Sequence, residues 1–174
     1  MERLVEYAVP SRGLIGYRGE FLTSTRGTGI MSRIFTGFEP WAGPIPHRLN
    51  GALVADRGGR VTTYAVEILQ DRGQLFVAPG DEVYLGMVAG ENARENDMDV
   101  NIVREKKLTN MRASTSDQAA KIDVPHRPTL EEALTWIADD ELVEVTPSAV
   151  RIRKFILDPT KRDLVRKKEK KAGG

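Results

Sequence analysis

Short apolar segments separated by turn-forming residues are the feature that most constrains how this chain can fold. The 174 residues include 16 Gly and 9 Pro, and Val, Ile and Thr fill many of the stretches between them. β-Branched residues favour strands, while Gly and Pro interrupt them, so many short strands are expected. A hydrophobic share of 40% is enough to form a buried core. We therefore predict a strand-rich α+β protein.

The first part of the chain has the pattern of half a ferredoxin-like unit. We expect a strand at residues 3–9, a helix over residues 11–27 and a second strand at residues 30–38. A complete split βαβ unit would add two more strands and a second helix. We therefore expect the chain to be a fragment of a longer protein. We also expect residues 1–40 to expose apolar surface, which would pack on another copy or on the second domain.

The remainder has the pattern of a small β-barrel or sandwich-like domain with one or two helices. Thr129 and Glu132 have the spacing of a capping box, which predicts a helix over residues 130–138. The core-facing side of this helix would comprise Leu130, Ala133, Leu134 and Ile137. Alternating apolar segments predict strands at residues 52–56, 61–69, 74–77, 83–88, 98–103, 142–146 and 149–157.

We divide the chain into three parts on these patterns. Residues 1–42 form the partial ferredoxin-like segment, residues 43–158 the β-rich domain and residues 159–174 a basic tail. The tail has only a weak helical pattern, so we expect a frayed helix or disorder at its end. Its many Lys and Arg residues are explained as well by solubility as by RNA binding.

The segment of residues 104–117 is basic and has no buried-face pattern of either helix or strand period. Its cations are Arg104, Lys106, Lys107 and Arg112, against the single nearby acid Glu105. Leu108 and Met111 are too few to anchor a core element. Cations combined with Asn, Thr and Ser donors suit a nucleic-acid backbone, because most such contacts go to phosphate and sugar oxygens. By composition alone, a solvated surface loop explains the segment equally well.

An acidic region of the chain leaves a second function open. Residues 129–146 contain six acidic residues and no Lys or Arg, so this region should repel nucleic acid. The alternative function is therefore a protein-interaction domain that uses the acidic helix and an uncovered sheet. A further basic set lies near the N-terminus, where a solvated helix face explains it best; it comprises Arg12, Arg18, Arg26 and Arg33.

Several kinds of chemistry are excluded by missing residues. The chain has no Cys, so it has no disulfide, thiolate metal site or cysteine nucleophile. It has no P-loop and cannot hydrolyse GTP alone. It also has no Lys within residues 1–105, which argues against a carrier domain with a modified lysine. No apolar run approaches the length of a membrane span, and the N-terminus does not resemble a signal peptide, so we expect a soluble cytoplasmic protein.

The remaining candidates for a catalytic or ligand site are weak. Gly13, Gly16 and Gly19 depart from the spacing of a dinucleotide-binding loop. The histidines His47 and His126 lie beside prolines and have no partner at ligand spacing. The consecutive acids Asp139, Asp140 and Glu141 should point in different directions, so we do not expect them to converge on a metal or a proton. We therefore predict no enzyme activity, cofactor or metal on this chain.

Several blocks of sequence resemble known translation factors. Residues 7–17 read YAVPSRGLIGY, followed by FLT and TRGTG, and resemble the second half of domain V of elongation-factor-G-type proteins. The residues of these blocks resemble the BipA/TypA family of translational GTPases still more closely. The unique C-terminal domain of that family is resembled by residues 70–73 (QDRG), 79–84 (PGDEVY), 107–114 (KLTNMRAS), 139–147 (DDELVEVTP) and 151–154 (RIRK).

The resemblance implies a fragment of a ribosome-binding GTPase that acts in large-subunit assembly and in stress or cold adaptation. The GTPase domain, with its GTP and Mg, would lie outside this chain. In the family, the C-terminal domain contacts ribosomal RNA and the acceptor end of an A-site tRNA. Carried onto the matching block, this implies RNA contacts by Lys106, Lys107, Asn110 and Arg112, with Arg104 as a flanking candidate.

Overall fold

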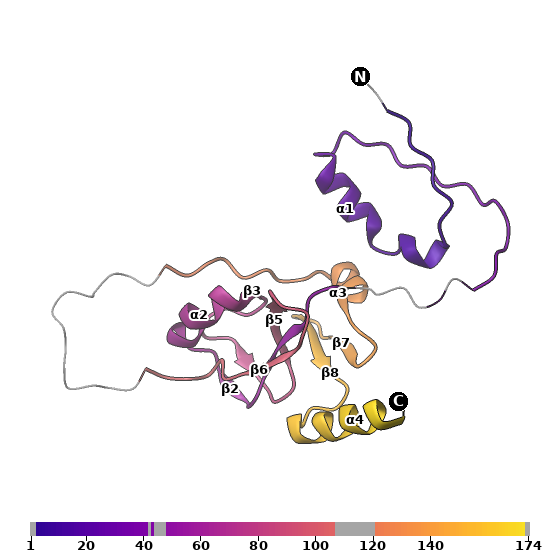
Figure 1. Cartoon of the computed structure of the whole chain (residues 1–174). Helices are drawn as coiled ribbons and strands as arrows, with labels where there is room; N and C mark the ends of the chain where they lie inside the picture. Colours follow the sequence, from indigo (N-terminus) through magenta and orange to yellow (C-terminus); the bar gives the residue numbers. More distant parts are fainter. Residues whose placement is uncertain (1–2, 42, 44–47, 107–120, 173–174) are drawn as a thin grey trace. The chain divides into compact units, whose positions relative to one another are not determined.

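The computed structural model describes residues 3–41, 43, 48–106 and 121–172, and these residues form two compact units (Figure 1). One unit comprises the residues up to His47, and the other begins at Arg48. Among the helices of the described ranges, none is long and apolar enough to cross a membrane.

The first unit is built around a short helical segment. A 3-10 helix, η1 (Ser11–Leu14), precedes helix α1 (Tyr17–Ser24), and Gly16 between them has a left-handed φ of 77°. The predicted helix is therefore confirmed in place but interrupted. The predicted strands at residues 3–9 and 30–38 were wrong, since the described residues there form no ladder. A sheet of only two strands is marginally stable in water. The apolar side chains of these two segments are exposed.

The second unit is centred on a four-stranded sheet with the order β3-β5-β1-β6. These strands are β3 (Gly73–Leu75), β5 (Val88–Asn92), β1 (Ala52–Ala55) and β6 (Met98–Val100). Strand β1 pairs antiparallel with β5 and parallel with β6. All four residues of β1 are buried, as expected for a central strand with both faces covered. The sequence ALVA therefore forms the middle of the core.

Most of residues 61–69 form a helix, and the strand predicted there was wrong. Helix α2 (Thr63–Leu69) is followed by the 3-10 helix η2 (Gln70–Arg72). The hydroxyl of Thr62 caps α2 by accepting a hydrogen bond from the Ala65 amide at 3.2 Å. Ala65, Val66 and Leu69 lie on one helical face and are buried. A cap and a helical apolar face thus outweigh the β-branched composition of this stretch. Strand β2 (Gly59–Arg60) precedes α2 in the sequence, and strand β4 (Glu82–Val83) follows it. The two strands pair antiparallel with each other.

A helix and a hairpin follow in the C-terminal half of this unit. Helix α3 (Leu130–Trp136) has the predicted capping box, which is confirmed in both directions between Thr129 and Glu132. Strands β7 (Glu141–Val145) and β8 (Val150–Lys154) form an antiparallel pair. The hairpin and α3 share a second hydrophobic cluster with the main sheet, through Ala52, Val54, Val88, Ala133 and Ile152. The expected core face of α3 is only partly correct, because Leu130 and Leu134 are exposed.

The basic tail folds as helix α4 (Pro159–Ala172). The disordered or frayed end expected from its charge is therefore not observed within the described residues. The Asp158 carboxylate accepts a hydrogen bond from the Lys161 amide at 3.1 Å, which satisfies one free donor at the start of the helix. With four α-helices and three sheets, the described residues confirm the strand-rich α+β class.

Candidate nucleic-acid interface

The basic segment begins directly after residues of the hydrophobic core. Strand β6 ends at Val100, and Ile102 is still buried at 1% exposure. Arg104 and Lys106, two and four residues later, are exposed. The first cations of the segment therefore project into solvent close to a fixed point of the sheet.

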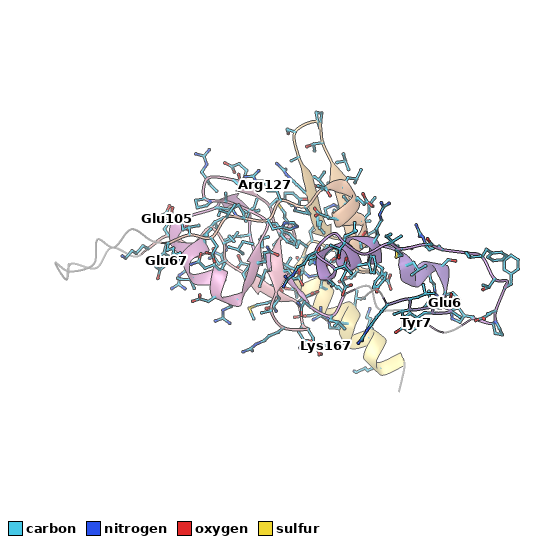
Figure 2. All side chains as sticks on the ribbon, turned by 90° about the horizontal axis from the view of Figure 1, so that it is seen from above. Glu6, Tyr7, Glu67, Glu105, Arg127 and Lys167 are labelled. Atoms are coloured by element: carbon cyan, nitrogen blue, oxygen red, sulfur yellow. The ribbon has the colours of Figure 1, made fainter. Side chains whose placement is uncertain are left out.

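The cap of α2 holds the N-terminal end of the segment. The Thr62 amide donates to the Ile102 carbonyl at 3.3 Å, and the Thr62 hydroxyl donates to the carbonyl of Arg104. The Arg104 guanidinium carbon lies 6.0 Å from the centre of the Tyr64 ring, at the outer range of a cation–π contact. Glu105, which Figure 2 labels, is an exposed acid beside these cations.

Only two of the five predicted RNA-contact residues are in the described part of the chain. Arg104 and Lys106 lie together at the exposed start of the segment. Lys107, Asn110 and Arg112 fall within residues 107–120, outside the described residues, so their role stays a prediction.

The chain resumes at Lys121 and runs beside α2 and β3. Gln70, the residue after α2, donates from Nε2 to the Lys121 carbonyl at 3.0 Å and accepts from the Asp123 amide at 3.2 Å. The His126 amide then donates to the Leu75 carbonyl of β3 at 2.8 Å. Sequence patterns gave no sign of this role for Gln70.

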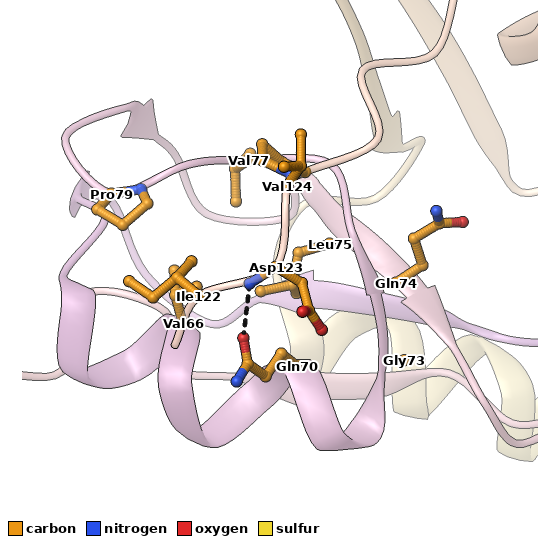
Figure 3. A pocket seen from close by; sticks show the side chains of 11 residues that line it. Val66, Gln70, Gly73, Gln74, Leu75, Val77, Pro79, Ile122, Asp123 and Val124 are labelled. Carbon is orange, nitrogen blue, oxygen red and sulfur yellow. Dashed lines mark hydrogen bonds between the residues drawn. The ribbon is translucent and has the colours of Figure 1, made fainter. Parts of the chain in front are cut away.

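A cavity of about 290 Å³ lies between this returning segment and α2 (Figure 3). Its walls are mainly apolar and include Val66, Leu75, Val77 and Ile122, with Gln70 at one side. The segment therefore rests on α2 through specific hydrogen bonds and only partly through close apolar packing.

Other cations of this unit are already paired with acids. The guanidinium of Arg57 lies 2.9 Å from Asp56, that of Arg60 lies 3.1 Å from Glu82, and that of Arg127 lies 3.0 Å from Asp81. Their side chains are mostly exposed. Such pairs weaken the local positive potential, so these three arginines are poor candidates for phosphate contacts.

Helix α4 is held near its start by the side chain of Arg162. Arg162 donates to the carbonyls of Ile156 and Leu157 at 3.0 and 2.6 Å and pairs with Asp99. Burial raises the pKa of Asp99, and the charge of Arg162 offsets only part of this rise. Lysines remain exposed on the helix, as Lys167 is in Figure 2.

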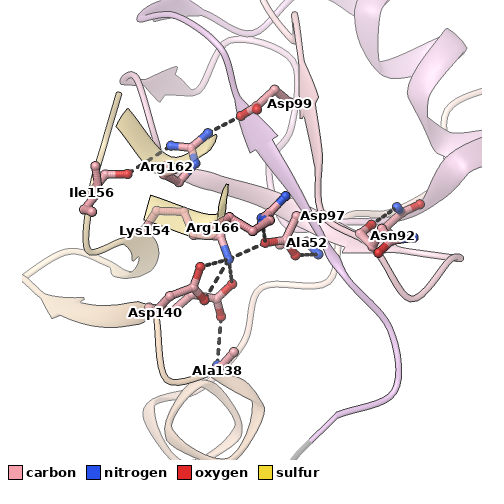
Figure 4. Close-up of polar contacts among 12 residues, drawn as sticks. Ala52, Asn92, Asp97, Asp99, Ala138, Asp140, Lys154, Ile156, Arg162 and Arg166 are labelled. Atoms are coloured by element: carbon pink, nitrogen blue, oxygen red, sulfur yellow. Dashed lines mark hydrogen bonds and ion pairs between the residues drawn. The ribbon is translucent and has the colours of Figure 1, made fainter. Parts of the chain in front are cut away.

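The acids at residues 139–141 do not all diverge, which corrects the expectation from sequence. Asp140 and Glu141 converge with Asp97 on the ammonium of Lys154, whose side chain is buried (Figure 4). The ammonium lies 2.6 Å from Asp97, 2.8 Å from Glu141 and 3.0 Å from Asp140. Carboxylate oxygens of these acids lie close enough to one another for a metal ion, but the Lys154 ammonium already supplies the positive charge there.

The charge states in this cluster support one another. Burial lowers the pKa of Lys154, but the charge of Glu141 and hydrogen bonds to Asp97 and Glu141 outweigh it, so the net pKa is raised. Burial raises the pKa of Asp97, but hydrogen bonds from Lys154 and the Ala52 amide outweigh it, so the net pKa is lowered. Arg48 adds two hydrogen bonds of 2.7 Å to Glu141. The cluster is thus a charged structural link between the β7–β8 hairpin and the residue that precedes β6.

The other sequence candidates have local structural contacts. His126 packs edge-on against Phe76, with 6.0 Å between ring centres, and its Nε2 lies 3.9 Å from Glu132. His47 lies outside the described residues. In the first unit, Arg12 stacks 3.3 Å above the Trp41 ring, whereas the side chains at three further positions are exposed, namely Arg18, Arg26 and Arg33.

Two family models match adjoining parts of the chain. Residues 1–49 match the elongation factor G C-terminus, and residues 50–159 match the TypA/BipA C-terminal domain. The second match alone covers more than half of the 174 residues.

Curated relatives are similar over most of the chain. The large ribosomal subunit assembly factor BipA of Bacillus subtilis (strain 168) is 45% identical over 168 residues, which are 96% of this chain and 28% of that protein. The protein of the same name from Escherichia coli (strain K12) is 49% identical over 151 residues, or 86% of this chain and 25% of the relative. That of Synechocystis sp. (strain ATCC 27184 / PCC 6803 / Kazusa) is 43% identical over 150 residues, with the same two shares. The chain thus spans about a quarter of the length of these relatives.

Proposed function

This chain belongs to the TypA/BipA family, and on that premise we propose that it is a ribosome-binding region that contacts large-subunit ribosomal RNA through its basic segment. The contact residues are Arg104, Lys106, Lys107, Asn110 and Arg112. The segment would also reach the acceptor end of an A-site tRNA. The relatives' printed name, large ribosomal subunit assembly factor, supports a ribosomal partner.

The observation that supports this proposal most is the exposure of Arg104 and Lys106 immediately beyond the buried Ile102. Cations on a fixed base can meet phosphates without ordering a long flexible arm first, which lowers the entropic cost of binding. Arg57 and Arg60 of the same unit are paired with acids, so the basic segment is the better phosphate ligand.

Catalysis in this proposal belongs to the longer protein of which such a region is part. This chain has no P-loop, so GTP and Mg would bind elsewhere, in a GTPase domain. The region described here would then hold that GTPase on the ribosome in the cytoplasm, in large-subunit assembly and during stress or cold adaptation.

Charge reversal tests the RNA contact. The triple variant Lys106→Glu, Lys107→Glu and Arg112→Glu should bind purified large ribosomal subunits more weakly. Because each lost phosphate contact removes counterion release, the slope of log K against log salt should fall by about 2 to 3. Unchanged affinity and slope would refute the RNA contact.

A matched variant controls for overall charge. Arg57→Glu, Arg60→Glu and Arg127→Glu change the net charge by the same amount on the same unit, at arginines that are paired with acids. The salt slope of this control should stay close to that of the parent chain. Equal losses in the two triple variants would show a general charge effect in place of a specific contact.

A second candidate function is a protein interaction on α3. Leu130 and Leu134 are 43% and 57% exposed beside the acidic residue Glu131, which gives an amphipathic surface. If a protein binds there, ribosome binding should survive removal of accessible RNA by nuclease but fall in the variant Leu134→Ser. Loss of binding after nuclease treatment would favour the RNA contact instead.

A further inference from the structure

The two described ends of the basic region are tied to opposite ends of one helix. On the N-terminal side of residues 107–120, the Arg104 carbonyl accepts a hydrogen bond from Thr62, the cap of α2. On the C-terminal side, Lys121 and Asp123 are bound by Gln70, the first residue after α2. Eight residues at about 1.5 Å per residue separate Thr62 from Gln70, or roughly 12 Å along the helix. Helix α2 therefore sets the spacing between these two attachment points.

The Gln70 side chain binds the chain as a neighbouring strand would. Its amide nitrogen donates to the Lys121 carbonyl. Its amide oxygen accepts from the Asp123 amide, as Figure 3 shows. One side chain thus satisfies a backbone acceptor and a backbone donor two residues apart, which is the alternation of a strand edge. This two-bond geometry fixes the register of residues 121–123 against α2.

The Thr62 side chain has two partners as well. Its hydroxyl accepts from the Ala65 amide, which caps α2, and donates to the Arg104 carbonyl. The hydroxyl has one donor and can serve both roles at once. The start of the helix and the first basic residue are therefore held by the same atom.

These contacts are not needed to complete the hydrophobic core. Lys121 and Asp123 are exposed, and the bonds from Gln70 lie at the surface, where water could replace them. The cavity beneath Ile122 also leaves the segment incompletely packed on α2. The contribution of Gln70 is accordingly to the position of the chain more than to the burial of apolar surface.

We propose that Thr62 and Gln70 are positioning residues that hold Arg104 and residues 121–123 at a fixed spacing, which places the exposed cations Arg104, Lys106 and Lys121 for binding to a nucleic-acid backbone. The inference rests on the proposed RNA contact, but it adds residues that contact no RNA themselves. Cations on a backbone that is already held in place have less conformational freedom to lose on binding, so affinity rises without additional charge contacts.

The experiment compares variants of Gln70 in the full chain. Gln70→Leu removes both bonds, and Gln70→Glu keeps an acceptor for the Asp123 amide but cannot donate to the Lys121 carbonyl. Gln74→Leu is the matched control, because Gln74 lines the same cavity and its side chain makes no hydrogen bond within the described residues. At the other end, Thr62→Val removes the hydroxyl and Thr62→Ser restores it.

Two measurements separate positioning from folding and from charge. Hydrogen exchange of the Asp123 amide, without RNA, should accelerate in Gln70→Leu but not in Gln74→Leu. Affinity for purified large ribosomal subunits should fall by about 3- to 10-fold in Gln70→Leu, by less in Gln70→Glu, and not in the control. The salt slope should stay that of the parent, because no phosphate contact has been removed. Thr62→Val should lower affinity, and Thr62→Ser should restore it.

Each other outcome has a definite meaning. Unchanged exchange of the Asp123 amide in Gln70→Leu would overturn the inference. Faster exchange with unchanged ribosome affinity would also overturn it, while the charge-reversal variant would still report on the RNA contact itself. A reduced salt slope in Gln70→Leu would contradict positioning, because it would mean that phosphate contacts had been lost. If charge reversal leaves binding unchanged, the proposed function fails independently of the exchange result.

Discussion

Lys154 and Glu141 are direct cross-strand partners in the β7–β8 hairpin, and their charged atoms lie 2.8 Å apart. Both side chains are buried. The same ammonium lies 2.6 Å from Asp97, which directly precedes β6, so it joins the hairpin to the main sheet. The hairpin is thus joined to the main sheet by an ion pair as well as by the apolar side chains that the two share.

Removing this cation should strongly destabilise the second unit. In Lys154→Met, the buried carboxylate of Glu141 and the partly buried one of Asp97 lose a partner. Loss of a partner in a buried ion pair typically costs about 3 to 5 kcal/mol. Urea unfolding, followed by the fluorescence of Trp136 near the cluster, would measure the change. Lys168→Met, at an exposed position on α4, should shift the free energy by less than about 0.5 kcal/mol. Similar stability of the two variants would contradict a structural role for Lys154.

The lowered pKa of Asp97 predicts a definite pH dependence. Because its pKa is lower in the folded state than the ordinary 3.8, ionised Asp97 stabilises the fold at higher pH. This contribution is complete above the unfolded-state pKa and is lost as pH falls through the folded-state pKa. In Asp97→Asn, the free energy of unfolding should be lower near neutral pH, and the difference from the parent should shrink below about pH 4. A difference that grows on acidification would show that the sign is wrong.

The capping box of α3 predicts a smaller, local effect. Thr129→Ala removes the hydroxyl that accepts from the Glu132 amide, and loss of such a cap costs about 1 kcal/mol. The free energy of unfolding would measure it. Thr135→Ala is the control within the same helix, because the Thr135 hydroxyl only donates back to the Glu131 carbonyl. Equal destabilisation by the two variants would argue against the cap.

The capping box was predictable because its two residues are three positions apart in the sequence. Lys154 also left a local sign, since alternation places it on the same inward face as Val150 and Ile152. A lysine at an inward position requires buried partners. Those partners lie at Asp97 and around Glu141, which are far from one another in the sequence, so local pattern could not identify them.

The strand predicted at residues 61–69 failed for a different reason. Val61, Val66 and Ile68 favour strands by composition, but the burial of Val66 and Leu69 with the Thr62 cap suits a helix packed on the sheet. No sequence pattern marks Gln70, because a Gln directly after a helix is common. Its role follows only from the return of Lys121 beside it.

Crosslinking tests the central claim, an RNA contact of the basic segment, most directly. A photoreactive side chain placed at Lys106 or Asn110 in the full chain would be irradiated with purified ribosomes, and the crosslinked RNA positions mapped. The same probe at Arg60 is the control. We predict crosslinks from Lys106 and Asn110 to large-subunit ribosomal RNA near the tRNA acceptor end, and few from Arg60. Crosslinks only to ribosomal proteins, or equal RNA crosslinking from Arg60, would contradict the account.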